Sequence, residues 1–177
     1  MKIGYGWDSH EFKPGIPLKI GGLEISHPSG LGGHSDGDVL LHAITDALLG
    51  SVAAQDIGTL FSPSDARWKG ADSALFLAEA MRRVKTAGYR IVNLDSTLIL
   101  AAPKIGPHTA AIRKHISGLM KIAPDCIGIK AKTPEGLNLD NAAMAQVVVL
   151  LEEIPKTPTR KPRSHKPGSH KSKKSTR

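Results

Sequence analysis

The sequence contains little cysteine and few aromatic residues. Among its 177 residues there is one cysteine, Cys126, and aromatic side chains make up 4% of the chain. A single cysteine excludes an internal disulfide, and the absence of a Cys-x-x-Cys pair removes the usual ligands of a structural zinc. Any zinc in this protein must therefore be held by histidine and carboxylate side chains.

The chain also lacks a long apolar run. A membrane-spanning helix needs about 20 consecutive apolar residues, and no segment approaches that length. Charged Lys2 and Asp8 stand where a secretory signal would carry its apolar stretch. We therefore expect no membrane partner and a cytoplasmic location. A hydrophobic content of 40% over 177 residues is enough for one domain with its own core.

Acidic residues are absent from residues 156–177, which hold nine of the 24 Lys and Arg. The rest of the chain carries 15 basic and 16 acidic residues, so the net charge of +8 arises in this segment. Pro, Ser, His and Lys alternate there with almost no apolar residue, so the segment cannot bury enough surface to fold. We predict a domain over residues 1–155 and a disordered basic tail over residues 156–177. The tail is either a solvated appendage, which we favour, or a weak, salt-dependent and non-specific ligand for nucleic acid.

Hydrophobic periodicity predicts an α/β (α+β) domain with a mixed sheet. The alternation over residues 3–8 is typical of a strand, and two glycines at 21–22 between β-prone runs indicate a hairpin. The best helix begins at residue 35 or 36, both good N-cap residues, and continues to about residue 52. The continuously apolar run 147–151 indicates a strand buried on both faces. The other expected elements are a loop over 55–70, helices over 72–88 and 107–120, a β-rich run over 91–102 and a strand over 127–132.

Asp8, His10 and His42 are candidate ligands for a divalent metal. Asp8 and His10 lie two residues apart on the first predicted strand, so both side chains point to one face. His42, on the predicted helix, can supply a third ligand, and three protein ligands with one open position are typical of catalytic zinc. Asp38 and Asp46 lie four residues to either side of His42, where either carboxylate could orient the imidazole. Spacing alone leaves open the alternative that these histidines are hydrogen-bonded core residues.

The segment His-Ser-Asp-Gly-Asp, residues 34–38, stands at the start of the same predicted helix. Backbone N–H groups and the helix dipole attract anions at such a position. The segment is therefore either an anion-binding turn or an ordinary helix cap.

Seven motifs lie in one unbroken register from the first residue to about residue 153. They are IGYGWDSH (3–10), GHSDGDVLLHAITDALLG (33–50), DIG (56–58), KGADS (69–73), APK (102–104), PH (107–108) and KAKTPEG (130–136). Together they closely resemble the 2-C-methyl-D-erythritol 2,4-cyclodiphosphate synthase family. We expect no fused cytidylyltransferase, because the resemblance starts at the first residue and only the tail follows it.

The resemblance implies a metal-dependent phosphorus–oxygen lyase of the non-mevalonate route to isoprenoid precursors. Such an enzyme cyclises 4-diphosphocytidyl-2-C-methyl-D-erythritol 2-phosphate to 2-C-methyl-D-erythritol 2,4-cyclodiphosphate and releases CMP. Asp8, His10 and His42 match the ligands of one zinc per subunit, and Glu135 matches a ligand of a second cation, Mg or Mn. The substrate's own 2-phosphate is the nucleophile, so no Ser-His-Asp triad is required.

By the same resemblance, His34 and Thr133 are catalytic, and His34 and Ser35 lie beside the phosphates. Thr133 matches a residue that stabilises the transition state. The implied substrate contacts are Asp8, His10, His34, Ser35, Asp56, Ile57, Gly58, Phe61, Asp65, Leu100, Ala101, Ala102, Pro103, Lys104, Ile105, Gly106, Ala131, Lys132, Thr133, Pro134 and Glu135.

The resemblance also implies a two-layer sandwich with helices on one face of the sheet, assembled as a homotrimer with the sheets around the three-fold axis. Residues 56–58 match ribose contacts, whereas residues 100–106 and 131–133 match the cytosine and phosphate pocket of the adjacent subunit. The active site would then lie at each subunit interface. The loop over residues 61–70 could close over it as a lid.

Two positions depart from the family pattern. Ala142 stands where many members carry an arginine that contacts phosphate, and we expect Lys132 to replace that charge. The same change removes charged groups from the trimer's central cavity, which makes binding of an isoprenoid diphosphate there doubtful. Pro63 stands where some relatives have an aspartate that contacts the sugar alcohol.

Two rival functions share these features. A metal-dependent phosphohydrolase would use the same three ligands to activate water. A nucleic-acid-binding protein would depend on residues 156–177, with the globular part as a scaffold.

Overall fold

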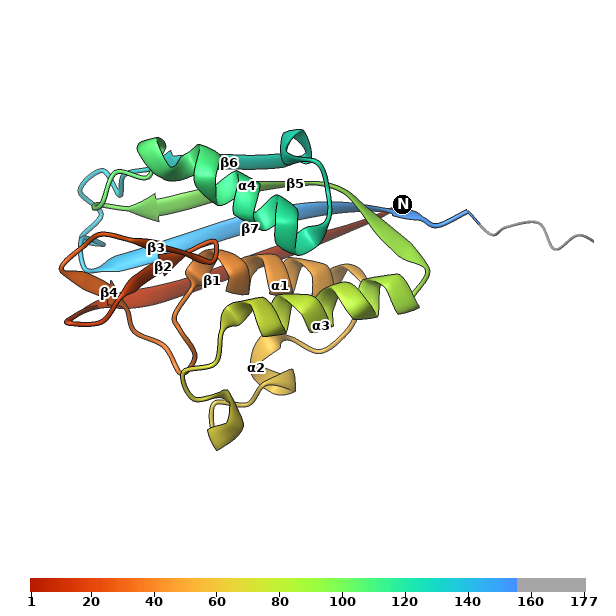
Figure 1. Cartoon of the computed structure of the whole chain (residues 1–177), viewed down its shortest axis with the longest axis horizontal. Coiled ribbons are helices and arrows are strands. Elements are labelled where there is room, and N and C mark those ends of the chain that lie inside the picture. The colour runs from red at the N-terminus through yellow and green to blue at the C-terminus, as the bar shows by residue number, and fades with distance from the viewer. Residues whose placement is uncertain (156–177) are drawn as a thin grey trace, which may run out of the picture.

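The computed structural model describes residues 1–155, and the predicted tail, residues 156–177, lies outside the described residues. Five strands form one mixed sheet in the order β4-β1-β7-β5-β6 (Figure 1). In chain order these are β1 (Lys2–Pro14), β4 (Ser29–Leu31), β5 (Tyr89–Leu100), β6 (Ile127–Lys132) and β7 (Ala142–Glu153). Strand β7 is antiparallel to both neighbours, β1 and β5, whereas β5 and β6 run parallel.

The remaining elements complete a second layer. A separate hairpin joins β2 (Leu18–Ile20) to β3 (Leu23–Ile25), as the two glycines between them predicted. The helices are α1 (Val39–Ser51), α2 (Ile57–Leu60), α3 (Ser73–Thr86) and α4 (Thr109–Met120). No helix within residues 1–155 is long and apolar enough to cross a membrane.

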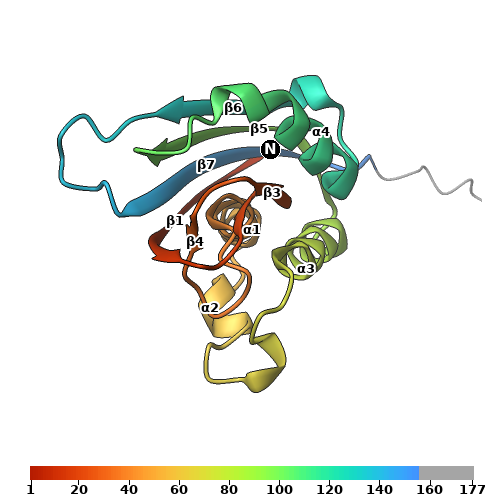
Figure 2. The same cartoon turned by 60° about the vertical axis from the view of Figure 1, so that its left-hand side comes forward.

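All the helices that cover the sheet lie on one of its faces (Figure 2). Paired residues of adjacent strands share a face, and the pairs formed by Val147 with Gly6 and with Ser96 place all three on the helix side. Alternate residues of β7 on this side are fully buried in the core. The expected two-layer arrangement with helices on one face is therefore confirmed.

The predicted burial of β7 on both faces is wrong for the single chain. Val148 is 46% exposed, and on the neighbouring strand Ile3, Tyr5 and Trp7 are 70%, 58% and 48% exposed. These four side chains project from the face that no helix covers. The apolar run identified a buried strand correctly, but in one chain only every second residue meets the core.

Two glycines of β1 determine how close α1 lies to the sheet. A Cβ added at Gly4 would overlap the carbonyl oxygen of Ala47, and a Cβ added at Gly6 would overlap that of Ala43. Both carbonyls belong to α1, so only glycine at these positions lets the helix backbone approach β1 this closely. The next residue of β1 on the same face is Asp8, beside the helix that carries His42.

Helix α1 begins at Val39, four residues later than the earliest predicted start. Asp38 is its N-cap, and its carboxylate accepts hydrogen bonds from the backbone N–H groups of Leu40 and Leu41. The preceding Gly37 has a φ of 71° and cannot continue a helix. Three possible caps in four residues made the start ambiguous in the sequence.

Candidate metal and substrate site

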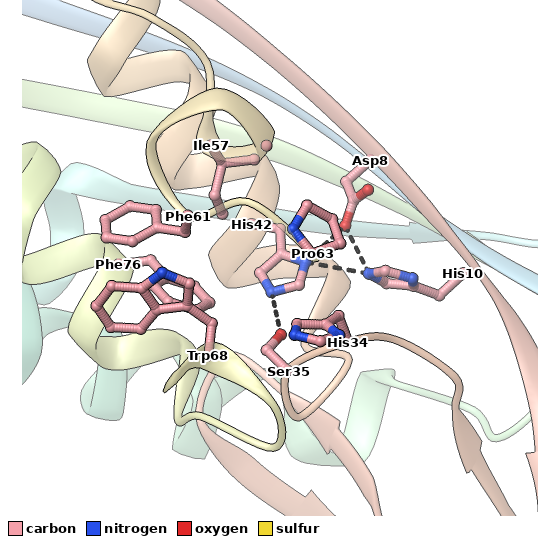
Figure 3. A pocket seen from close by; sticks show the side chains of 11 residues that line it. Asp8, His10, His34, Ser35, His42, Ile57, Phe61, Pro63, Trp68 and Phe76 are labelled. Carbon is pink, nitrogen blue, oxygen red and sulfur yellow. Dashed lines mark hydrogen bonds and ion pairs between the residues drawn. The ribbon is translucent and has the colours of Figure 1, made fainter. Parts of the chain in front are cut away.

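Asp8, His10 and His42 converge at the wall of a pocket, as their spacing predicted (Figure 3). His10 Nε2 lies 2.9 Å from Asp8 Oδ2, His42 Nδ1 lies 3.0 Å from the same oxygen, and the two nitrogens are 3.0 Å apart. The three donor atoms therefore form a nearly equilateral triangle. Two come from β1, and the third comes from α1, which Gly4 and Gly6 hold against that strand.

This triangle fits a divalent transition metal. At zinc–ligand distances of about 2.0–2.1 Å, neighbouring donors of a tetrahedral site lie roughly 3.3 Å apart, so an opening of a few tenths of an ångström admits the ion. Two imidazoles and one carboxylate, with a pocket on the fourth side, are the donor set of catalytic rather than structural zinc. Asp8 is only partly exposed, which limits competition from water.

The ionisation of Asp8 also suits a metal ligand. Burial pulls the pKa of its carboxyl upward, but the hydrogen bonds and charges of His10 and His42 outweigh burial and hold the pKa at about 2. The carboxylate is therefore ionised throughout the neutral range. The ionised oxygen of Asp8 has no hydrogen to lose and lies near one ring nitrogen of each histidine. One cation can therefore bind all three atoms.

The second ring nitrogen of His42, Nε2, contacts two serines. It contacts neither of the two carboxylates that were predicted to orient the ring. His42 Nε2 lies 3.0 Å from Ser35 Oγ and 2.9 Å from Ser73 Oγ. The expectation that Asp38 or Asp46 orients this ring is wrong, because both carboxylates have other partners.

Asp38 and Asp46 instead hold backbone. Besides capping α1, Asp38 accepts the N–H groups of Gly21 and Gly22 and so fixes the β2–β3 turn to the helix. Asp46 accepts the N–H of Ile57 at 2.8 Å and so anchors the start of α2. Burial raises the pKa of both carboxyls. Both residues do lie four residues from His42 in the sequence, but the predicted role of orienting its ring was wrong.

The pocket in front of the three ligands has a volume of about 190 Å³. His34 and Ser35 line one side, and Ile57 lines another (Figure 3). Gly58, which with Ile57 belongs to the expected ribose contacts, is also part of the lining. Pro63 also lines it, at the position where some relatives have an aspartate.

An aromatic wall closes the pocket opposite Asp8 and His10. It consists of Phe61, Trp68 and Phe76, with ring centroids 4.4–5.8 Å apart (Figure 3). Phe61 was expected as a contact. Trp68 and Phe76 were missed, because the spacing of aromatic residues on different elements carries no signal until the chain folds.

The loop over residues 61–70 is tied to the site by backbone. The N–H of Gly70 donates to the carbonyl of His34, and the His34 ring contacts the carbonyl of Asp65 at 3.3 Å. The Asp65 carboxylate pairs with Arg67 and does not line the pocket. Asp56 caps α2 by accepting the N–H of Thr59, and this hydrogen bond lowers the pKa of its carboxyl.

The other expected contacts gather in a second pocket of about 450 Å³, at the ends of β5 and β6. It shares no lining residue with the first pocket. Glu135 lies here, hydrogen-bonded to Thr133, and not with the three metal ligands. The lining residues are Leu100, Ala101, Pro103, Lys104, Ile105, Gly106, Pro107, Ala131, Lys132, Thr133 and Glu135. Of the expected contacts in this region, Ala102 and Pro134 are outside the lining.

This fold and ligand set define a class of protein with known members. Residues 1–152 match the model of the YgbB family, and the chain belongs to that family. The 2-C-methyl-D-erythritol 2,4-cyclodiphosphate synthase of Koribacter versatilis is 65% identical over 153 residues, which cover 86% of this chain and 99% of that protein. The chloroplastic enzyme of the same name from Oryza sativa is 47% identical over 154 residues, covering 85% of this chain and 69% of that protein.

A solved structure of a 2C-methyl-D-erythritol-2,4-cyclodiphosphate synthase, described as its CDP-bound form, shares the fold. It superposes with a TM-score of 0.81 at 46% identity, covering 85% of this chain and all of that one.

Proposed function

We propose that this chain cyclises 4-diphosphocytidyl-2-C-methyl-D-erythritol 2-phosphate to 2-C-methyl-D-erythritol 2,4-cyclodiphosphate and releases CMP. An oxygen of the 2-phosphate forms a bond to the β-phosphorus. The bond from that phosphorus to the oxygen bridging it to the α-phosphorus breaks, and CMP leaves with the bridging oxygen. The observation that carries the proposal is the Asp8, His10 and His42 cluster facing a pocket in a chain 65% identical to a synthase of this name.

Asp8, His10 and His42 are the residues that would hold one zinc per subunit. When bound, zinc supplies positive charge that neutralises and positions the diphosphate. Ser35 and His34 line the same pocket and can donate hydrogen bonds to phosphate oxygens. Glu135 is the proposed ligand of a second cation, Mg or Mn.

The reaction needs the substrate to be folded and kept from water. A well-oriented intramolecular attack can lower a barrier by roughly 7–11 kcal/mol, which is why no nucleophile from the protein is required. The aromatic wall of Phe61, Trp68 and Phe76 excludes water on one side of the pocket. The 61–70 loop, which carries two of these rings, is the proposed lid.

The proposed assembly is a homotrimer whose sheets surround the three-fold axis. Its support is the uncovered apolar face formed by Ile3, Tyr5, Trp7 and Val148, which a folded monomer rarely leaves in water. Further support is the separation of the expected contacts into two pockets, because the metal ligands and expected ribose contacts line one and the expected cytosine and phosphate contacts line the other.

Lys132 is proposed to supply the phosphate charge that Ala142 lacks. Lys132 lines the second pocket with Lys104 and stands beside Thr133. Ala142 is the first residue of β7, the central strand of the sheet, and pairs with Glu11 of β1.

The deciding experiment measures metal and product on one purified sample. We expect one zinc per chain and, by phosphorus NMR, a cyclic diphosphate together with CMP. His42→Ala should lose zinc and CMP release together, whereas His27→Ala, which removes a histidine distant in sequence from the three ligands, should keep both. Free phosphate in place of the cyclic product would identify a phosphohydrolase. Full activity without bound metal would overturn the proposal.

A further inference from the structure

A chain of hydrogen bonds begins at Nε2 of His42 and continues through three residues that do not line the pocket. Ser73, the first residue of α3, is fully buried and places Oγ 2.9 Å from His42 Nε2. The same hydroxyl contacts Asp36 Oδ1. Lys19 completes the chain, with Nζ 3.3 Å from Asp36 Oδ2.

The partners of Asp36 fix the direction of these hydrogen bonds. Its carboxylate faces the ammonium of Lys19 and the backbone N–H groups of Ser73 and Asp38, at 3.3 Å and 3.4 Å. All three are donors, and a carboxylate can only accept. The hydroxyl of Ser73 must therefore donate to Asp36.

That direction determines where the proton of His42 sits. A serine has one hydroxyl hydrogen, and once Ser73 gives it to Asp36, Ser73 offers only lone pairs to His42 Nε2. A hydrogen on Nε2 matches these lone pairs, and a metal at the site would then bind the lone pair of Nδ1, the ring nitrogen that faces Asp8 and His10. Ser35, the other neighbour of Nε2, has no such fixed partner among the described residues, and its hydrogen is available to the pocket.

We propose that Ser73 and Asp36 are positioning residues, which hold the hydrogen of His42 on Nε2 and so present Nδ1 as a metal ligand. A carboxylate bonded directly to the second nitrogen of a ligating histidine is a common arrangement, and here one hydroxyl stands between the two. This chain of hydrogen bonds connects three segments to His42, namely β2, α3 and the turn before α1. His42 itself lies on none of these segments. This inference rests on the proposed metal site and specifies which residues outside the pocket maintain it.

The test is the zinc dissociation constant, measured by competition with a chelator. Ser73→Ala removes the acceptor and should weaken zinc binding by about 10–100-fold, the usual effect of losing such a partner. Asp36→Asn should weaken it at least as much. Its amide can donate to Ser73, which then donates to Nε2 and drives the hydrogen onto Nδ1. Lys19→Met, at a partly exposed position, should have a smaller effect in the same direction.

Ser96→Ala is the matched control. Ser96 is also buried, and its hydroxyl donates to the carbonyl of Gly128 at 2.8 Å, so the variant loses a comparable hydrogen bond far from the metal ligands in sequence. Its zinc affinity should be unchanged. In the zinc-loaded wild type, NMR should show a slowly exchanging His42 Nε2–H, and this signal should exchange faster in Ser73→Ala.

The results distinguish a failure of the positioning role from a failure of the metal site. If the wild type binds zinc and makes the cyclic product, but Ser73→Ala and Asp36→Asn bind zinc as tightly as Ser96→Ala does, the positioning role is overturned and the function stands. If the wild type binds no zinc, the metal site itself is overturned.

Discussion

At the residue scale, the convergence of the candidate metal ligands was predictable, and the residues that support them were not. Asp8 and His10 share a strand face by simple alternation, and one histidine on the adjacent helix completed the set. Ser73 stands 31 residues from His42, and no periodicity links a helix start to a side chain on another helix. The orientation of His42 therefore could not be predicted, and the nearest carboxylates in the sequence were chosen wrongly.

The low pKa of Asp8 predicts an acid-sensitive contribution to stability in the metal-free protein. A carboxyl whose folded pKa, about 2, lies below its ordinary value of 3.8 stabilises the fold above the higher value. It loses that contribution as the pH falls through the lower one. The difference corresponds to at most about 2 kcal/mol. With chelator present, the free energy of unfolding in urea should therefore fall more steeply between about pH 4 and pH 2 in the wild type than in Asp8→Asn.

Asp125→Asn is the control for that measurement, because Asp125 is exposed in a short turn after α4. It should keep the steep acid dependence of the wild type. An identical slope in wild type and Asp8→Asn would show that the Asp8 cluster contributes nothing to folding.

The proposed role of Lys132 predicts a loss of turnover without a loss of zinc. A charge-assisted hydrogen bond contributes about 1.5–3 kcal/mol, so Lys132→Ala should lower kcat/KM for CMP release by roughly 10–150-fold. Lys114→Ala, on the exposed side of α4, should leave it unchanged. If Lys132→Ala released CMP at the wild-type rate, Lys132 would not be the residue that replaces the arginine absent at Ala142.

At the element scale, the position of α1 depends on glycine in β1. The sequence showed strand alternation here, but not that the glycines meet helix carbonyls, because this contact exists only when the two elements pack. Most element types were predicted correctly, but the predicted loop over residues 55–70 contains helix α2. The ends of the elements were predicted less well, because Ser35, Asp36 and Asp38 compete as caps and only tertiary contacts decide among them.

Gly6→Ala should therefore weaken both the fold and the metal site. The new methyl group would push α1 away from β1, and overpacking of this kind lowers the free energy of unfolding by about 1–3 kcal/mol. Because His42 moves with α1, zinc affinity should fall as well. Urea unfolding and chelator competition on the same sample measure both effects.

Gly118→Ala provides the control, because a Cβ at Gly118 meets nothing within 4 Å on the exposed side of α4. This variant should be neutral or more stable by up to about 1 kcal/mol, since alanine favours the helix. If Gly6→Ala bound zinc as tightly as the wild type does, α1 could move away from β1 without displacing His42.

At the scale of the whole molecule, one chain leaves an apolar face uncovered and divides the expected contacts between two separate pockets. The apolar run of β7 predicted burial on both faces, and the described chain buries only one. A single sequence cannot distinguish a strand covered by its own chain from one covered by another copy. The uncovered face and the divided contacts have one common explanation, which is the proposed homotrimer.

Val148→Asp should separate the subunits. A carboxylate at the centre of the apolar face would be buried without a partner on assembly, so analytical ultracentrifugation should show monomers in place of trimers. Leu75→Asp is the matched control, because Leu75 is 58% exposed on α3, in the helix layer on the other side of the sheet. It should remain trimeric and active.

Activity in mixed assemblies tests whether each active site draws on two subunits. His42→Ala damages only the first pocket and Thr133→Ala only the second, so each variant should be inactive alone. Co-expressed at equal levels in a closed trimer, about one quarter of the interfaces would pair an intact first pocket with an intact second pocket. CMP release should then recover to about that fraction of the wild-type rate. Mixing His42→Ala with Asp8→Ala, which both damage the first pocket, should restore nothing. If the mixture of His42→Ala and Thr133→Ala also stayed inactive while forming trimers, both pockets of a working site would belong to one chain.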